Sequence, residues 1–475
     1  MLLGIDLGTG SVKALLLDAN GTVLAEAAQP YRVDSPKPGW AETDPQAWWR
    51  ATGAAVRQVV AQAARPVEAI GLSGQMHGVV LTDQEGQPLR PAILWADLRS
   101  SPVLAEYQRL PATLQTRLAN PITAGMAGPT LLWLKQAEPE IVATARWAMQ
   151  PKDWLRLQII GEVLAEPSDA SGTLLFDLAS DRWAFEVMEA LHLRTDWLPN
   201  LIPSSQIAGS LTPEAAEHLG LEAGIPVVAG AADTAAAILG SGLLTPGSLQ
   251  LTVGTGAQIA MPVARPQADP TLRTHLYRAA LPDQWYRLAA MQNAGLALDW
   301  VRTLLGFSWP EVYANPAPPG CEGLSFLPYL TGERTPHLNP DARGAWVGLA
   351  LHHTRSHLMG AALEAVAFAI KQGLEAIAPG QVSRLQLAGG GTLEPQWRQL
   401  LATVLQVPLY SISISAASAQ GAAKLAGLGI GVYKDASALP PVQITAAPTL
   451  PQPVPPELED AWLRFQALYP RLYSS

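Results

Sequence analysis

The first 33 residues alternate between apolar runs and glycine-containing breaks, which is typical of strands joined by tight turns. The runs LLGID and VKALLLD flank the segment LGTGS, so residues 2–18 predict a strand, a glycine turn and a second strand. Asn20-Gly21 then separates VKALLLD from TVLAEAAQPYRV, and Asn-Gly between apolar runs is a strong hairpin signal. This segment therefore predicts three consecutive strands.

The apolar period changes to that of a helix from Asp44 to Ala64. Asp44-Pro45 supplies an N-cap and a first-turn proline for this helix. A short buried strand is predicted from Val67 to Leu72, ending in Ser73-Gly74. Strands followed by helices in this order indicate an α/β domain.

The second half of the chain repeats the opening pattern. Ile5–Gly10 reads IDLGTG and Leu251–Gly256 reads LTVGTG, and both are strand, Gly-Thr-Gly and strand, 246 residues apart (251 − 5). This repeat predicts two related domains that face each other across a cleft. We place the boundary at the Pro-Gly turn of LLTPGS, which gives domains of residues 1–244 and 245–475.

The remaining elements of the second half follow the same rules. A long helix is predicted from Ser356 to Ile377, and a strand from Arg384 runs into three glycines that end at Gly391. Seven prolines lie between Pro440 and Pro456, which predicts an extended connector. A final short helix is predicted from Glu457 to Leu468.

Composition narrows the class of protein. The 475 residues are 48% hydrophobic and only 15% charged, a balance that supports a folded core and excludes wholesale disorder. The net charge of −9 argues against nucleic acid or an anionic membrane as the main partner. Cys321 is the single cysteine, the first residues do not read as a signal peptide, and no stretch has the apolar length of a membrane span. We expect a soluble, cytoplasmic protein.

Asp6 is the first candidate for chemistry. It stands at the end of an apolar strand, beside a glycine turn whose N–H groups can approach a phosphate while the carboxylate holds Mg²⁺ through water. The alternative is an aspartate that merely closes a β-turn. The second Gly-Thr-Gly turn favours a role for Asp6 in phosphate and metal binding, because two such hairpins facing one cleft would bind a triphosphate from both sides. The chain contains no GxxxxGK[ST] motif, so this is not a P-loop.

Asp233 is the second candidate. It follows the strand-like IPVVAG and precedes TAAAILGSG, a run of small residues that predicts a helix. Asp233 is either an ordinary N-cap or a general base that takes a proton from a substrate hydroxyl at the positive end of that helix. Spacing alone does not separate the two roles.

The third cluster is Gln75-Met76-His77, on the loop after the strand that ends at Gly74. Ligands of α/β domains bind at such strand ends, and amide, imidazole and thioether groups suit a small polyol. Trp95 and Asp97 follow another strand and are candidates for the same pocket, although a buried tryptophan with a surface Asp–Arg pair explains them equally well. Gly389, Gly390 and Gly391 form the fourth cluster, where bare backbone can meet an adenine or ribose.

Together these motifs resemble the FGGY carbohydrate kinases, members of the actin-like sugar kinase and heat-shock ATPase superfamily, and within that family the xylulokinases. GIDLGTGSVKALLLD is similar to the first phosphate hairpin, LTVGTGAQI to the second, and LAGGGTLEPQW to the adenosine segment. SGQMHG and PYLTGERTPHLNPDARGAWVGL are the most xylulokinase-like stretches. The chain departs from the pattern at Ala96 and around Asp233, where relatives carry Asn or more glycine, and at Thr130, where a Lys is common.

The resemblance implies two actin-like (ribonuclease H-like) ATPase domains around a catalytic cleft and ATP-dependent phosphorylation of D-xylulose. Asp233 is then the catalytic base, and Asp6 and Asp233 are the acids associated with Mg²⁺. The implied sugar contacts are Gln75, Met76, His77, Trp95, Asp97 and Asp233. The implied ATP contacts are Gly8, Thr9, Gly10, Ser11, Gly254, Thr255, Gly256, Gly389, Gly390 and Gly391.

Two alternatives stay open at this point. The first is a kinase for another ketopentose or polyol such as D-ribulose, since the departures lie near the implied sugar pocket. The second is a nucleotide-switch protein of the actin or heat-shock type, which shares two facing ATPase domains and has no sugar pocket. The sequence predicts a monomer or homodimer without choosing between them.

Overall fold

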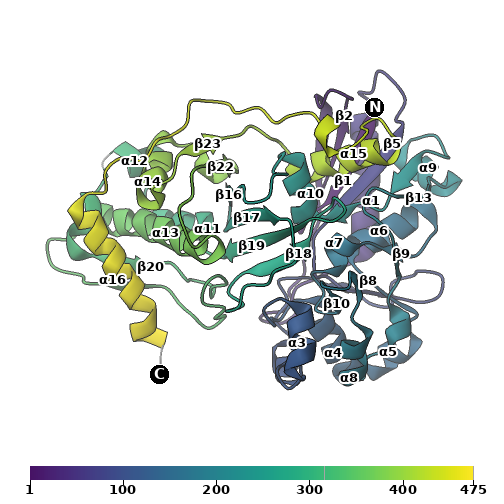
Figure 1. Cartoon of the computed structure of the whole chain (residues 1–475), viewed down its shortest axis with the longest axis horizontal. Helices are drawn as coiled ribbons and strands as arrows, with labels where there is room; N and C mark the ends of the chain where they lie inside the picture. The colour runs from purple at the N-terminus through teal and green to yellow at the C-terminus, as the bar shows by residue number, and fades with distance from the viewer. Residues whose placement is uncertain (315, 474–475) are drawn as a thin grey trace.

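The computed structural model describes residues 1–314 and 316–473. The chain forms two lobes, one built mainly from its first half and one from its second, each around a sheet flanked by helices (Figure 1). The fold is therefore a mixed α/β fold of two domains, as the sequence predicts.

The N-terminal sheet has the strand order β13-β14-β5-β1-β2-β3, with β15 paired to β5. Its strands are β1 (Leu2–Leu7), β2 (Ser11–Leu17), β3 (Val23–Pro30), β5 (Ala69–Gly74), β13 (Ile207–Ser210), β14 (Pro226–Val228) and β15 (Ala231–Ala232). The C-terminal sheet has the order β18-β19-β17-β16-β22-β23. Its strands are β16 (Gln250–Val253), β17 (Ala257–Val263), β18 (His275–Arg278), β19 (Trp285–Met291), β22 (Leu385–Ala388) and β23 (Leu409–Ser411).

The two sheets share one pairing scheme. β1 pairs antiparallel with β2 and parallel with β5, and in the same way β16 pairs antiparallel with β17 and parallel with β22. The next strands outward also agree, because β2–β3 and β17–β19 are antiparallel while β5–β14 and β22–β23 are parallel. The repeat of the Gly-Thr-Gly pattern thus reflects two domains with the same strand arrangement.

The helices of the first half cover the N-terminal sheet and fill the lower part of its lobe (Figure 1). They are α1 (Pro45–Val60), α2 (Leu104–Gln108), α3 (Ala112–Leu118), α4 (Ala127–Ala137), α5 (Pro139–Thr144), α6 (Pro151–Ile160), α7 (Pro167–Ala170), α8 (Phe185–Ala190), α9 (Pro213–Leu219) and α10 (Asp233–Gly240). Those of the second half are α11 (Gly295–Leu304), α12 (Trp309–Ala314), α13 (Arg355–Ile377), α14 (Pro395–Leu405), α15 (Ala417–Gly429) and α16 (Pro456–Tyr473).

Short strands complete the loops. In the first half these are β4 (Glu42–Thr43), β6 (Val80–Thr82), β7 (Ala92–Ile93), β8 (Trp147–Met149), β9 (Leu164–Ala165), β10 (Phe176–Asp177), β11 (Arg182–Trp183) and β12 (Asn200–Leu201). In the second half β20 (Ser325–Leu327) pairs antiparallel with β21 (Ala345–Val347).

The predicted elements are confirmed with shifts at their ends. Helix α1 begins at Pro45, and the Asp44 side chain caps it by accepting the Gln46 N–H at 3.0 Å. Helix α13 lies within one residue of its predicted range, and α16 continues five residues beyond Leu468. The proline-rich segment is extended, and two isolated bridges join it to β23 and to Ile412.

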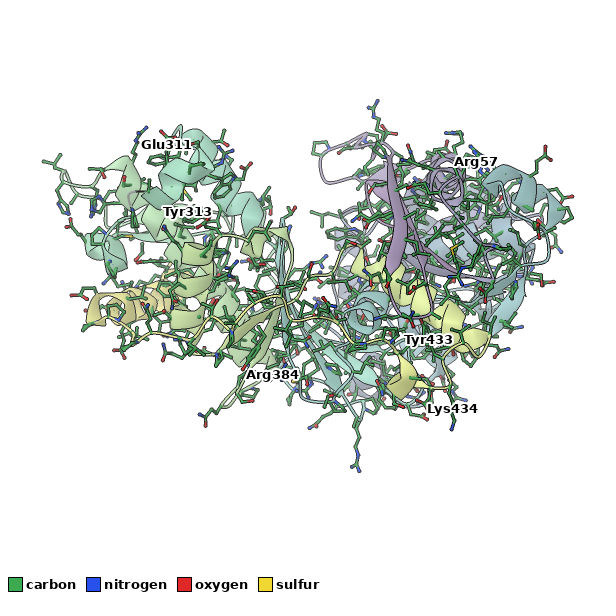
Figure 2. All side chains as sticks on the ribbon, turned by 90° about the horizontal axis from the view of Figure 1, so that it is seen from above. Arg57, Glu311, Tyr313, Arg384, Tyr433 and Lys434 are labelled. Carbon is green, nitrogen blue, oxygen red and sulfur yellow. The ribbon has the colours of Figure 1, made fainter. Side chains whose placement is uncertain are left out.

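Helix α15 belongs to the second half of the chain but lies on the N-terminal sheet. A Cβ placed on Gly4 or on Gly71 would lie 1.9 Å from the carbonyl oxygens of Ala419 and Ala422, so only glycine allows this approach. Figure 2 shows Tyr433 and Lys434, which follow α15, on the lobe that carries Arg57, whereas Arg384 lies on the other lobe. The division at residue 244 stays a prediction, and the second half contributes one helix to the first lobe.

Candidate functional site

Asp6 lies where the carboxyl ends of three parallel strands meet. In the register of the sheet Ser73 stands opposite both Asp6 on β1 and Ala231 on β15. The Ser73 hydroxyl donates to Asp6 Oδ1 at 2.8 Å. Burial raises the pKa of Asp6, and this hydrogen bond opposes that shift. The structure thus brings the predicted metal-associated acid to the edge where α/β domains bind ligands.

Asp233 is the first residue of α10, two residues after the strand position opposite Ser73. Ala232 occupies the N-cap position, and the Asp233 carboxylate instead accepts the N–H of Thr234 at 2.5 Å and its hydroxyl at 3.1 Å. Burial first, and then the negative charge of Asp6, raise the pKa of Asp233 to about 7. The ordinary capping alternative does not describe this residue, and a carboxyl that titrates near neutrality suits a general base.

The first glycine hairpin, Gly8 to Ser11, joins β1 to β2. The Gly8 N–H donates to the Ser11 carbonyl at 3.0 Å, and Trp95 Nε1 donates to Thr9 Oγ1 at 2.8 Å. The tip residue Gly10 is exposed, and a Cβ there would meet no atom within 4 Å. Hydrogen bonds therefore fix the base of this hairpin, and its tip is exposed.

The second hairpin, Gly254 to Gly256, is fixed by the start of α11. The Gly295 N–H donates to the Gly254 carbonyl at 3.0 Å, and the Gly254 N–H to the Gly256 carbonyl at 2.8 Å. The Thr255 carbonyl accepts hydrogen bonds from the backbone N–H groups of Ala294 and Leu296. Because β16 and β22 are parallel, this hairpin and the glycines after β22 share one edge of the sheet.

Three glycines follow β22, and two of them, Gly390 and Gly391, line a cavity. Gly389 has φ 96°, and a Cβ there would lie 2.3 Å from the Val253 carbonyl oxygen, so glycine is required. A cavity of about 680 Å³ opens above these residues. It is lined by Val253, Gly295, Leu298, Trp309, Pro310, Tyr313, Ala314, Gly390, Gly391, Leu393, Glu394, Gln396 and Trp397. Figure 2 shows Tyr313, with Glu311, on the lobe formed by the second half of the chain.

Gln75, Met76 and His77 follow β5 and lie together at the carboxyl edge of the N-terminal sheet. Gln75 and Met76 are buried, and the Tyr286 hydroxyl donates to Met76 Sδ at 3.8 Å. His77 Nδ1 lies 2.6 Å from the Gly172 carbonyl, so Nδ1 carries the proton and Nε2 is left as an acceptor. Burial lowers the pKa of His77 to about 4, which keeps the ring neutral. A neutral acceptor of this kind suits a sugar hydroxyl.

Trp95 and Asp97 have different surroundings. Trp95 contacts the first glycine hairpin, because its indole N–H donates a hydrogen bond to the Thr9 hydroxyl. Asp97 is buried, and its carboxylate accepts from Arg99 Nε at 2.9 Å, Arg99 Nη2 at 2.7 Å and the Ala41 N–H at 2.6 Å. These hydrogen bonds thus stabilise the loop that contains Asp97 and Arg99. Contact between Asp97 and a sugar stays a prediction.

The sequence interpretation missed the residues that reach this pocket from the second half. Tyr277 on β18 lies with its ring 5.9 Å from that of His77, and His275 stacks on Tyr277 at 5.6 Å. Arg334 lies over the ring of Trp95 at 5.1 Å. The family resemblance rested in part on the stretch PYLTGERTPH, so Arg334 could have been predicted as a site residue from the sequence. No local motif indicated that residues of β18 contribute to this pocket.

Two acidic residues provide a donor set that fits Mg²⁺. The charge of Asp6 raises the pKa of Asp233, so the two carboxyl groups are near enough to repel each other. Mg²⁺ prefers carboxylate and water oxygens, and a cation relieves such repulsion. Asp6 and Asp233 therefore remain the residues predicted to be associated with the metal.

Comparison with known proteins agrees with this geometry. The model of the N-terminal domain of the FGGY family of carbohydrate kinases matches residues 1–240, and that of its C-terminal domain matches residues 249–430. The chain belongs to the FGGY family of carbohydrate kinases and is a sugar phosphotransferase. The resemblance predicted from the motifs is thus confirmed.

Particular relatives narrow the class further. The chain is 36% identical over 441 residues to the xylulose kinase of Escherichia coli K12, which covers 91% of each chain. It is 30% identical over 426 residues to the gluconokinase of Bacillus subtilis, covering 85% of this chain and 83% of that protein. The crystal structure of xylulose kinase from Rhodospirillum rubrum superposes with a TM-score of 0.89 at 31% identity, covering 99% of each chain.

None of the helices in residues 1–314 and 316–473 has the length and apolar character that a membrane crossing requires.

Proposed function

We propose that this protein transfers the γ-phosphoryl group of ATP to the terminal hydroxyl of D-xylulose, giving D-xylulose 5-phosphate. The observation that carries the proposal is the Asp233 carboxyl at the start of α10, whose pKa is raised to about 7 by burial and by the charge of Asp6. The xylulose kinases among the relatives support the choice of sugar. Membership of a carbohydrate kinase family sets aside the nucleotide-switch alternative.

The side chains divide the work as follows. Asp233 accepts the proton of the attacking hydroxyl, and the neutral His77 accepts a hydrogen bond from another sugar hydroxyl through Nε2. The backbone N–H groups of the two glycine hairpins bind the phosphates, and the cavity above Gly390 receives the adenosine. Asp6 and Asp233 would hold Mg²⁺, whose positive charge would offset the charge of the transferring phosphoryl group.

An assay with a panel of acceptors tests the proposal. ADP formation with Mg-ATP is measured with D-xylulose, D-ribulose, L-ribulose, L-xylulose, xylitol and glycerol. We expect D-xylulose to give the highest kcat/KM. Preferred turnover of D-ribulose would keep the mechanism and show that Ala96 and the surroundings of Asp233 retuned the pocket, and no turnover with any acceptor would contradict the proposal.

The Asp233→Asn variant tests the base. We expect kcat to fall by about 10²-fold or more while the KM for D-xylulose changes little, because the amide keeps the shape and cannot accept the proton. Thr234→Val is the matched control, since it removes a hydrogen bond to the same carboxylate and leaves the base in place. A near-normal kcat for Asp233→Asn would remove Asp233 from the role.

The use of ATP supports a cytoplasmic location, which cell fractionation tests. The oligomeric state is proposed as monomer or homodimer, and light scattering on the purified protein separates the two.

A further inference from the structure

The segment that opens helix α13 is rich in histidine. Three of the eight histidines of the chain lie within residues 352–357. His352 and His353 precede the helix, and His357 lies in its first turn. The rings of His352 and His353 lie side by side, with their centroids 4.2 Å apart. Imidazole nitrogens are preferred ligands of Zn²⁺ and its neighbours in the transition series, so this segment gathers metal-binding groups outside the proposed active site.

A carboxylate from a separate segment completes the cluster. Glu322 lies in the short turn Pro319–Gly323, and its Oε2 lies 3.1 Å from His352 Nε2. One possible ligand atom from each of Glu322, His352 and His353 lies within 4.8 Å of the other two. In a tetrahedral zinc site, metal–ligand distances of about 2.0–2.2 Å place neighbouring ligand atoms about 3.3–3.6 Å apart. The Glu322–His352 pair is close to this spacing already, and side-chain rotations bring in the third ligand.

The backbone that presents Glu322 is held in an uncommon conformation. Cys321 and Glu322 have φ of 45° and 51°, in the left-handed region that residues other than glycine rarely adopt. The Gly320 N–H donates to the buried Glu364 carboxylate at 2.7 Å, and Arg464 Nη2 donates to the Gly320 carbonyl at 3.1 Å. These two hydrogen bonds fix the turn, so the fold sets the place of Glu322 beside the histidines.

The two histidines beside Glu322 have ring nitrogens to offer a metal. His353 Nε2 is buried and has no hydrogen-bond partner among residues 1–314 and 316–473, and an orphaned buried nitrogen is unfavourable. His353 Nδ1 accepts the Ala350 N–H at 2.9 Å. Ligation through either nitrogen of His353 releases this N–H, which water takes over because Ala350 is exposed. His352 is also exposed, so its Nδ1 can carry the ring proton towards solvent while Nε2 binds the metal.

His357 faces the same carboxylate in a different role. Its Nδ1 accepts the Thr354 N–H at 3.1 Å as part of the capping box of α13. The ring proton therefore lies on Nε2, which is 3.6 Å from Glu322 Oε2. A histidine N–H directed at a ligand carboxylate helps to orient it, so His357 is a neighbour of the ligands rather than one of them.

We propose that Glu322, His352 and His353 bind one Zn²⁺ ion, which joins the turn Pro319–Gly323 to the start of α13. Two imidazoles and one carboxylate are a zinc ligand set that water completes. Mg²⁺ and Ca²⁺ prefer oxygen ligands and do not suit it. The site belongs to the lobe that carries α13, whereas β1 and α10, which carry Asp6 and Asp233, belong to the other lobe (Figure 1). The inference is thus independent of the proposed Mg-ATP chemistry.

Zinc binding is measured by isothermal titration calorimetry on the full-length protein without a histidine tag. The protein is first stripped of metal with a chelator and then titrated with ZnCl₂ in excess MgCl₂, so that sites suited to Mg²⁺ are filled. Glu322→Gln, His352→Asn and His353→Asn each remove one ligand. His192→Asn is the matched control, because His192 is an exposed histidine of the other half of the chain. Thermal unfolding without zinc confirms that each variant is folded.

We expect the wild type and His192→Asn to bind one Zn²⁺ per chain and to be stabilised by it against heat. Each of the three ligand variants should bind Zn²⁺ at least about tenfold more weakly, since even residues that only orient a ligand contribute about 10- to 100-fold to metal affinity. The rise in unfolding temperature on adding ZnCl₂ should shrink in the same variants. NiCl₂ should compete with Zn²⁺, and CaCl₂ should not.

Four results would overturn the inference. The first is a wild type that binds no Zn²⁺, which would leave Glu322 and His352 as a surface ion pair. The second is zinc affinity unchanged in all three ligand variants, which would place the ion elsewhere on the protein. The third is an equal loss of affinity in His192→Asn, which would show unspecific binding. The fourth is displacement of Zn²⁺ by CaCl₂, which would indicate a site of oxygen ligands alone.

Discussion

A buried cluster of charged side chains lies beside Asp233, the proposed base, and its charge balance predicts how two substitutions change stability. Lys152 and Arg156 carry two positive charges, and Asp153, Glu166 and Asp169 could carry three negative ones, with every side chain at most 1% exposed. Lys152 Nζ lies 2.6 Å from Asp153 and 3.6 Å from both Glu166 and Asp169. One carboxyl group must therefore be protonated for the cluster to be neutral.

Asp169 is the carboxyl group that keeps the proton. Neither of its oxygens has a hydrogen-bond partner among the described residues, whereas the carboxylate of Asp153 accepts two hydrogen bonds and that of Glu166 accepts four. Burial raises the pKa of Asp169 well above its ordinary value, against the opposing charge of Lys152. Asp169→Asn then resembles the native protonated acid, and Lys152→Met leaves buried carboxylates without their cation.

The two substitutions should differ strongly in their effect on the free energy of unfolding. We expect Lys152→Met to lower it by about 3–5 kcal/mol, as for breaking a buried ion pair, and Asp169→Asn to change it by less than about 1 kcal/mol near pH 5. Because the folded pKa of Asp169 is raised, the wild type loses stability from this group as the pH rises above the unfolded pKa. The Asn variant lacks that loss and should gain up to about 1.4 kcal/mol per pH unit relative to the wild type.

Urea unfolding, followed by tryptophan fluorescence at pH 5, 6.5 and 8, measures both effects. The activity of each variant is a useful second readout, because Ser168, next to Asp169, accepts through Oγ the N–H of Ala232, the residue before the proposed base Asp233. If Asp169→Asn were as destabilising as Lys152→Met at pH 8, the charge assignment would be wrong.

Three further predictions concern the site and the contact between the halves. The kcat/KM for D-xylulose should fall about tenfold per pH unit below pH 7, because protonated Asp233 accepts no proton; a flat rate profile from pH 8 to pH 5 would contradict this. Asp6→Asn should raise the Mg²⁺ concentration for half-maximal rate at least about tenfold, which a Mg²⁺ titration of the rate measures; an unchanged requirement would remove Asp6 from the metal site. Gly71→Ala should lower the free energy of unfolding by about 1–3 kcal/mol or more, since its Cβ would overlap the Ala422 carbonyl. Gly10→Ala, at an open position, should impair activity and leave the midpoint of urea unfolding unchanged. Equal urea midpoints for the two variants would contradict the close packing of α15.

Local sequence signals predicted most of the fold and pointed to part of the candidate site. The glycine hairpins, Asp6 and the loop of Met76 and His77 follow from short motifs, because the chemistry and the turn are encoded in the same few residues. The raised pKa of Asp233 was not predictable, since it depends on burial in the folded protein and then on the charge of Asp6, which is more than two hundred residues away in the chain.

Residues that cross between the lobes were missed for the same physical reason. Tyr277 and Tyr286 read as ordinary strand residues, and their contact with Met76 and His77 depends on how β18 and β19 approach the first lobe. The packing of α15 was equally hidden, because Gly4 and Gly71 are strand glycines whose need for space appears only when the helix is present.

The position of α15 has a consequence for how the protein is made. The last strand of the sheet that α15 covers, β15, ends at Ala232, whereas α15 itself ends at Gly429, so about 200 residues must still be synthesised before the helix can cover the sheet. At the usual 5–20 residues per second, this leaves the apolar face under α15 open on the ribosome for roughly 10–40 s. During this interval the exposed apolar face is prone to aggregation. The first lobe therefore cannot bury this face until α15, which belongs to the second half of the chain, has been synthesised.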